Sequence, residues 1–133
     1  MQRHAFLLAC WFAIVLMLGL AGCESSMMKN FPPRYFKGET TLDRGIREYD
    51  EGNYKVAAKT IQSALDVGVT TSSQAKAHKY LAFMDCVAGQ TSQCRDEFKK
   101  ALAINPDFEL SPAEAGHPIW GPVFRSVKSQ PAK

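Results

Sequence analysis

The feature that most constrains the fold is an internal repeat in which small and apolar residues recur 37 positions apart. Within each copy the apolar residues follow the spacing i, i+4, i+7 and i+8, which lines one face of an α-helix. Because small side chains let two antiparallel helices approach closely, each copy predicts a helical hairpin. The matched positions are Gly45, Gly52, Tyr54, Ala57, Ile61, Ala64 and Leu65 in the first copy and Ala82, Gly89, Thr91, Cys94, Phe98, Ala101 and Leu102 in the second.

Apolar periodicity and capping residues predict four main helices, and strand-like alternation is not apparent. We expect helices over residues 41–49, from 53 to about 66, over about 73–88, and from 91 or 92 to 104. A short amphipathic helix is expected within residues 117–128. The chain is therefore predicted to be all-α.

The register of the two copies resembles the tetratricopeptide repeat, which places small residues where its two helices cross and a proline near its end. Pro106 stands at that terminal position in the second copy. The resemblance implies a short α-solenoid of two antiparallel helix pairs. Since about three repeats are normally needed to bury enough surface, we expect a C-terminal capping helix to close the stack. Trp120 and Phe124 are predicted to form this lid.

The N-terminus combines a basic residue, Arg3, with an apolar run of 14 residues from Ala5 to Leu18. This run is shorter than the roughly 20 residues of a membrane-spanning helix and is typical of a signal peptide. Leu20-Ala21-Gly22-Cys23 follows and resembles the lipobox of bacterial lipoproteins. The resemblance implies removal of residues 1–22 and attachment of an N-acyl and an S-diacylglycerol lipid to Cys23. The alternative is an ordinary cleaved signal peptide in which Cys23 is incidental.

Residues 23–40 are predicted to be a lipidated tether, because Pro32-Pro33 favours extended backbone. Residues 41–128 are predicted to form the repeat domain with its lid, and 129–133 a disordered tail.

In lipoproteins of bacteria with two membranes, absence of aspartate after the cysteine usually directs sorting to the outer membrane. Glu24 stands there. We therefore expect a lipid-anchored protein on the outer membrane that faces the periplasm, with the inner membrane as the alternative.

The charge balance indicates no nucleic-acid partner. The chain has 16 lysine and arginine against 13 aspartate and glutamate side chains, a net charge of +3. Loss of the leader removes only Arg3 among these groups, which leaves +2. No strongly basic face of the kind that binds nucleic acid is indicated.

The sequence also lacks a Gly-x-Ser-x-Gly nucleophile elbow and a phosphate-binding loop. We expect no enzyme and no cofactor besides the covalent lipid.

Cys86 and Cys94 are the two cysteines that remain once the leader is removed and Cys23 is acylated. In an exported protein such a pair favours a disulfide, here across the turn between two helices. Two buried thiols, or a redox-active pair in a thiol redox lipoprotein, are the alternatives. His78 with these cysteines does not have the spacing of common zinc sites.

The C-terminal tail contains Ser111-Pro112-Ala113-Glu114 and Gly116-His117-Pro118-Ile119-Trp120-Gly121-Pro122. With this tail as its most specific part, the mature domain resembles, over most of residues 41–127, the TssQ-type lipoproteins associated with type VI secretion. The resemblance implies an accessory of type VI secretion assembly or anchoring whose partners are envelope proteins. A general envelope adaptor, serving peptidoglycan machinery or another secretion system, is the alternative. Self-association into a homo-oligomer stays open.

By analogy with the repeat family, the first helix of each pair is expected to line a concave groove that binds a partner. Lysines beside aromatic side chains suit a peptide or helix that carries an acidic group. A solvated helix face is the alternative interpretation. The residues expected to be exposed there are Ile46, Tyr49, Lys76, Lys79 and Phe83.

Overall fold

The computed structural model describes residues 33 to 130, with side chains from residue 37 onward. These residues form six α-helices and no strand, which confirms the all-α prediction. The helices are α2 (Pro33–Asp50), α3 (Tyr54–Val67), α4 (Thr71–Val87), α5 (Thr91–Ile104), α6 (Pro112–Ala115) and α7 (Trp120–Lys128). The predicted leader 1–22 and the lipidation site Cys23 lie outside the described residues and stay predictions.

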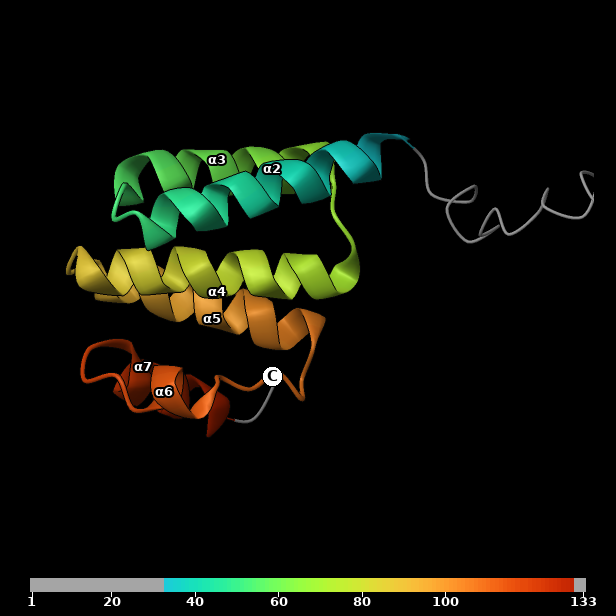
Figure 1. The fold of residues 1–133 in the computed structure, drawn as a ribbon. Helices are drawn as coiled ribbons and strands as arrows, with labels where there is room; N and C mark the ends of the chain where they lie inside the picture. Colours follow the sequence, from blue (N-terminus) through green and yellow to red (C-terminus); the bar gives the residue numbers. More distant parts are fainter. Residues whose placement is uncertain (1–32, 131–133) are drawn as a thin grey trace, which may run out of the picture. The chain divides into compact units, whose positions relative to one another are not determined.

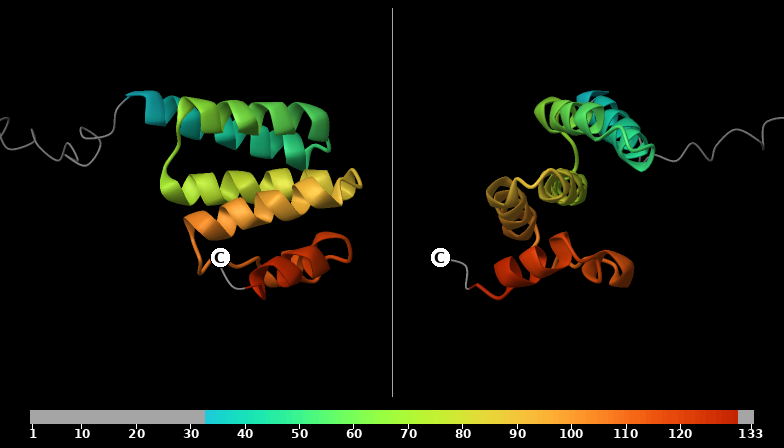
Figure 2. Two further views of the ribbon diagram at one scale, coloured as in Figure 1. Left: turned by 180° about the vertical axis from the view of Figure 1, so that it is seen from behind. Right: turned by 90° about the vertical axis from the view of Figure 1, so that its left-hand side faces the viewer.

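The helices form packed pairs, α2 with α3 and α4 with α5, and the short α6 and α7 follow below the second pair (Figure 1). Helix α4 contacts both helices of the first pair, and α7 contacts both helices of the second. Seen from the end, the pairs lie in successive layers (Figure 2). Helix α7 thus packs on the second pair as α4 packs on the first.

The repeat found in the sequence is also present in the backbone at the same offset. Helices α3 and α5 have 14 residues each, and the first begins 37 positions before the second. Gly52 and Gly89 end the preceding turns with φ of 81° and 76°, the left-handed region that favours glycine. The amides of Asn53 and Gln90 donate to carbonyls five residues earlier, each over 2.8 Å. The two hairpins are thus built with one turn geometry.

The first hairpin is closed by a glycine at the point of closest approach. A Cβ on Gly45 would lie 2.6 Å from Ile61 Cγ1 and 3.4 Å from the Ala57 carbonyl oxygen. No other residue fits this crossing without displacing its neighbours, which is why the sequence pattern has a glycine there. The surrounding core is Leu42, Ala57, Ile61, Ala64, Val69, Ala77, Leu81 and Met84.

The tether prediction for residues 33–40 was wrong, because helix α2 begins at Pro33 rather than Thr41. Proline is tolerated in the first turn, where its missing N–H would have no helical partner. Two contacts then hold the early part of α2 in place. Gly38 packs against the Gly68 carbonyl, which leaves no room for a Cβ. The Glu39 carboxylate accepts hydrogen bonds from the Thr70 amide at 2.7 Å and the Ser73 hydroxyl at 2.6 Å.

The C-terminal end of the domain also differs in extent from the predicted tail. The Ser129 amide donates to Arg125 over 3.0 Å and the Gln130 amide donates to Val127 over 3.1 Å. These two residues therefore continue the last turn of α7, contrary to the prediction that disorder begins at 129. Residues 131–133 lie outside the described part of the chain.

Candidate functional site

Three of the five residues predicted to line a partner-binding groove come together between α2 and α4. The rings of Tyr49 and Phe83 lie 6.5 Å apart, and Lys79 Nζ lies 5.6 Å from the Phe83 ring. The other two lie elsewhere. Ile46 packs against the core of the first hairpin, and Lys76 is exposed on α4 near the Glu39 carboxylate.

The prediction that Phe83 and Lys79 are open to a partner was wrong. The Phe83 side chain is only 2% exposed, because the Trp120 indole stacks on it with the ring centres 4.3 Å apart. Lys79 Nζ lies 2.6 Å from a carboxylate oxygen of Glu114, in the C-terminal segment. That segment therefore covers the second half of the expected groove with residues of the same chain.

The two residues predicted to form the lid lie in the core of the second hairpin. Trp120 is 8% exposed and Phe124 is 3% exposed. The Trp120 Nε1–H donates to the Glu114 carbonyl over 2.9 Å, so its polar atom is satisfied. Phe124 packs edge-on against Phe98, with ring centres 5.2 Å apart. The other buried members of this core are Ala82, Phe83, Cys86, Cys94, Phe98, Leu110 and Val127.

A cluster of tyrosines remains beside the covered half. Tyr49 lies 5.3 Å from Tyr54 and 5.0 Å from Tyr80 between ring centres. Burial raises the pKa of Tyr49 to about 12, and the neighbouring tyrosines, Asp50 and Glu114 add to that rise. Burial likewise raises the pKa of Tyr80. These phenols stay protonated at neutral pH, so they suit packing and hydrogen bonding rather than proton transfer.

Glu114 is the charged partner of this region. Its partial burial alone would raise its pKa, but hydrogen bonds from Lys79 and from Ser111 lower it below the ordinary value. The Ser111 amide donates to the Glu114 carboxylate over 2.9 Å as part of a capping box at the start of α6. Lys79 Nζ also lies 4.8 Å from the Tyr80 ring centre. The lysine is thus held between a carboxylate and an aromatic face, in the geometry of a cation–π contact.

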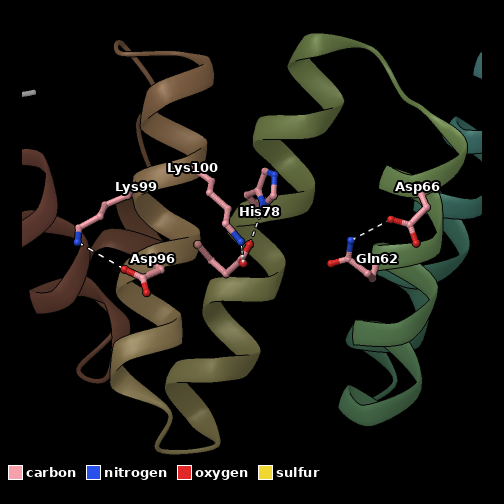
Figure 3. Close-up of polar contacts among 7 residues, drawn as sticks. Gln62, Asp66, His78, Asp96, Lys99 and Lys100 are labelled. Atoms are coloured by element: carbon pink, nitrogen blue, oxygen red, sulfur yellow. Dashed lines mark hydrogen bonds and ion pairs between the residues drawn. The ribbon is translucent and has the colours of Figure 1, made fainter. Parts of the chain in front are cut away.

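A second polar cluster joins the two helices of the second hairpin (Figure 3). His78 Nδ1 on α4 lies 2.6 Å from the Glu97 carboxylate on α5, and Lys100 Nζ lies 2.5 Å from its other oxygen. The remaining contacts in Figure 3, Gln62 with Asp66 and Lys99 with Asp96, are exposed and stay within one helix. Of the contacts drawn in Figure 3, only that between His78 and Glu97 links two helices.

The Glu97 cluster predicts an acid-sensitive contribution to stability. Burial alone would raise the pKa of Glu97, but hydrogen bonds from His78 and Lys100 lower it below its ordinary value of 4.5. A lowered pKa contributes stability above the unfolded-state pKa, which is lost as the pH falls through the folded-state pKa. Glu97→Gln is expected to reduce the free energy of unfolding by about 1–3 kcal/mol near pH 7.

Urea denaturation of Glu97→Gln and of the parent protein at several pH values checks this expectation. The gap between them should shrink as the pH falls below about 4. The exposed Asp66→Asn variant is the matched control and should stay within about 0.5 kcal/mol of the parent near pH 7. A gap for Glu97→Gln that is constant from neutral to acidic pH would contradict the assigned ion pairing.

The predicted disulfide between Cys86 and Cys94 is present, with a Cα–Cα distance of 5.1 Å. Cys86 is 6% exposed and Cys94 is 0% exposed, so the sulfurs lie inside the core of the second hairpin. Reactive cysteines are usually accessible and lie in electropositive surroundings. The burial therefore suits a structural staple. Within residues 33–130 no group of three or more His, Cys, Asp or Glu side chains could hold a metal ion.

No helix within the described residues is both long and apolar enough to cross a membrane. Comparisons with protein-family models, with curated proteins and with solved structures found no match for this chain. The case for a function therefore depends on the residues and contacts of the chain itself.

Proposed function

We propose that this chain is an outer-membrane lipoprotein that faces the periplasm and acts as a protein–protein adaptor. Its folded part is a tetratricopeptide-like α-solenoid of two antiparallel helix pairs, with α7 as the capping helix. The lipid on Cys23 supplies the location, and the helical scaffold supplies a surface for partners.

The observation that carries the adaptor proposal is the matched geometry of the two hairpins. Their turns and helix bounds repeat at 37 residues, and the first helix of each later layer packs on both helices of the one before. Stacked hairpins of this kind are typically used as binding scaffolds. The protonated tyrosines and the paired Lys79 give no support to acid–base chemistry, and the buried disulfide gives none to a redox role.

The partners we propose are components of a type VI secretion system, whose assembly or anchoring the protein assists. The support is the similarity of the tail, from Ser111 to Pro122, to the TssQ-type lipoproteins. In this chain Glu114 of the same segment forms an ion pair with Lys79, and Trp120 stacks on Phe83. The tail that carries the resemblance is thus also the part that completes the folded domain.

Cross-linking of intact cell envelopes, followed by quantitative mass spectrometry, tests this function. The full chain and a Cys23→Ser variant would be expressed at equal level, and incorporation of labelled palmitate would report acylation. We expect palmitate on the parent only, and enrichment of type VI membrane-complex or baseplate proteins that is lost with the lipid. Enrichment of cell-wall enzymes in their place would favour a general envelope adaptor, and absence of palmitate would contradict the anchor.

A further inference from the structure

The large apolar side chains left exposed are concentrated at the connections between paired helices. Among residues 37–130 they are Tyr54, Val56, Val87 and Ile119, with exposed fractions of 42%, 54%, 43% and 48%. Tyr54 and Val56 follow the α2–α3 turn, Val87 precedes the α4–α5 turn, and Ile119 ends the α6–α7 connection. The rest of the described surface has no side chain of this kind, so the placement calls for an explanation.

These three connections lie along one edge of the domain. Tyr49, at the end of α2, contacts Tyr80 and Phe83 near the end of α4, and Phe83 contacts Trp120 at the start of α7. Figures 1 and 2 show the three connections on the same side of the layers, opposite the start of α2. We call this surface the turn edge. It consists of the apolar Tyr54, Val56, Val87 and Ile119 and the acidic Asp50 and Glu51.

The charge of the turn edge restricts what can dock there. Asp50 and Glu51 are both exposed at the first turn, and neither forms an ion pair within residues 37–130. Lys55 follows the same turn, and Arg125 donates to the Ala115 carbonyl over 3.0 Å at the α6–α7 connection. The acidic charge of this edge therefore lies at the first turn, on Asp50 and Glu51. A partner with apolar side chains and a lysine or arginine complements this edge.

The point of attachment to the membrane favours a protein as that partner. Helix α2 has 18 residues and so extends about 27 Å from its start to the turn edge. Nine residues, 24–32, lie between the acylated Cys23 and the start of α2, so the tether joins the domain at the edge opposite the turns. An anionic lipid surface would be repelled by Asp50 and Glu51. A second copy docked through the same edge would bring these like charges together.

We propose that the turn edge docks a segment of a periplasmic protein that presents apolar side chains together with a lysine or arginine. This inference rests on the proposed anchoring at Cys23 and adds to it the docking surface and the chemistry of the partner. It also moves the binding surface away from the groove that the C-terminal segment covers.

Site-specific photo-cross-linking in living cells tests the surface. The photoreactive residue p-benzoylphenylalanine would replace Val87 or Ile119 in the full-length chain, with Ser63 and Lys99, exposed on α3 and α5, as control positions. We expect one protein adduct at Val87 and Ile119 and none at the controls. Mass spectrometry of the cross-linked peptide should locate it in an apolar segment that contains lysine or arginine.

A charge reversal separates specific docking from mere proximity. Asp50→Lys should reduce the adduct at Val87 by about tenfold or more, since like charges at an interface cost more than 1.4 kcal/mol. Asp66→Lys makes the same charge change at the C-terminal end of α3, away from the turn edge, and should leave the adduct unchanged. Thermal unfolding followed by circular dichroism shows whether each variant is folded.

Four outcomes would overturn the inference: no adduct, equal adducts at all four positions, an adduct of two copies of this chain, or an adduct with lipid. Palmitate labelling of the same samples reports the anchor separately. Absence of the label together with a position-specific protein adduct would contradict the anchoring and support the docking surface. A palmitate-labelled protein without an adduct would contradict the docking surface alone.

Discussion

Replacing Trp120 with alanine is expected to lower the free energy of unfolding of the whole domain by about 3–5 kcal/mol. The indole is 8% exposed and stacks on Phe83, and its Nε1–H is bonded to the Glu114 carbonyl. Its removal would leave a cavity beside Phe83 and open the contact between α4 and α7. Since α7 packs on α4 and α5, and α4 packs on both helices of the first hairpin, the loss should reach both hairpins. Urea denaturation followed by circular dichroism measures it.

Two further variants identify which part of the Trp120 contact matters. Trp120→Phe keeps an aromatic ring over Phe83 but removes the donor to the Glu114 carbonyl, so a smaller loss of about 1–2 kcal/mol is expected. Ile119→Ala changes the neighbouring residue, which is 48% exposed, and should cost no more than about 0.5 kcal/mol. A Trp120→Ala protein with the stability of the parent would refute the view that α7 completes the core.

The helical hairpins could be predicted because their determinants are local and occur twice. The spacing that begins at Ala57 recurs at Cys94, and Gly52 and Gly89 supply the same left-handed turn. Each copy supports the other, so helix bounds were predicted to within a few residues. The start of α2 had no such support. Its position depends on Gly38 and Glu39, which contact residues about 30 positions later.

The contacts around the predicted groove could not be read from helix periodicity. Lys79 and Glu114 are 35 residues apart, and the segment that contains Glu114 belongs to neither copy of the repeat. A periodic pattern shows which face of α4 is apolar but not what covers it. The aromatic character of Trp120 predicted a lid, whereas its position over Phe83 required the path of the chain between α5 and α7. The repeat analogy therefore predicted an open groove where the chain binds its own tail.

Removing the disulfide by the double substitution Cys86→Ala and Cys94→Ala is expected to lower the free energy of unfolding by about 2–3 kcal/mol. The two cysteines are 8 residues apart, and closing so short a loop removes a limited amount of entropy from the unfolded chain. In the first hairpin the matching positions are Tyr49 and Ala57, so that hairpin has no staple and depends on the close crossing at Gly45. For a domain of this size the urea midpoint should fall by about 1–2 M.

Reductant provides the internal control for the disulfide, because it should act on the parent and not on the double variant. Alkylation under denaturing conditions should modify Cys86 and Cys94 only after reduction, as measured by the mass of the intact protein. With reductant present during unfolding, the parent should approach the stability of the Cys86→Ala and Cys94→Ala protein. If the oxidised parent and the double variant unfold at the same urea concentration, the second hairpin is held by packing of Phe83, Phe98 and Trp120 alone. If reductant lowers the stability of the parent but not that of the variant, the difference in stability comes from the disulfide bond itself, because the packing of these rings is common to both proteins.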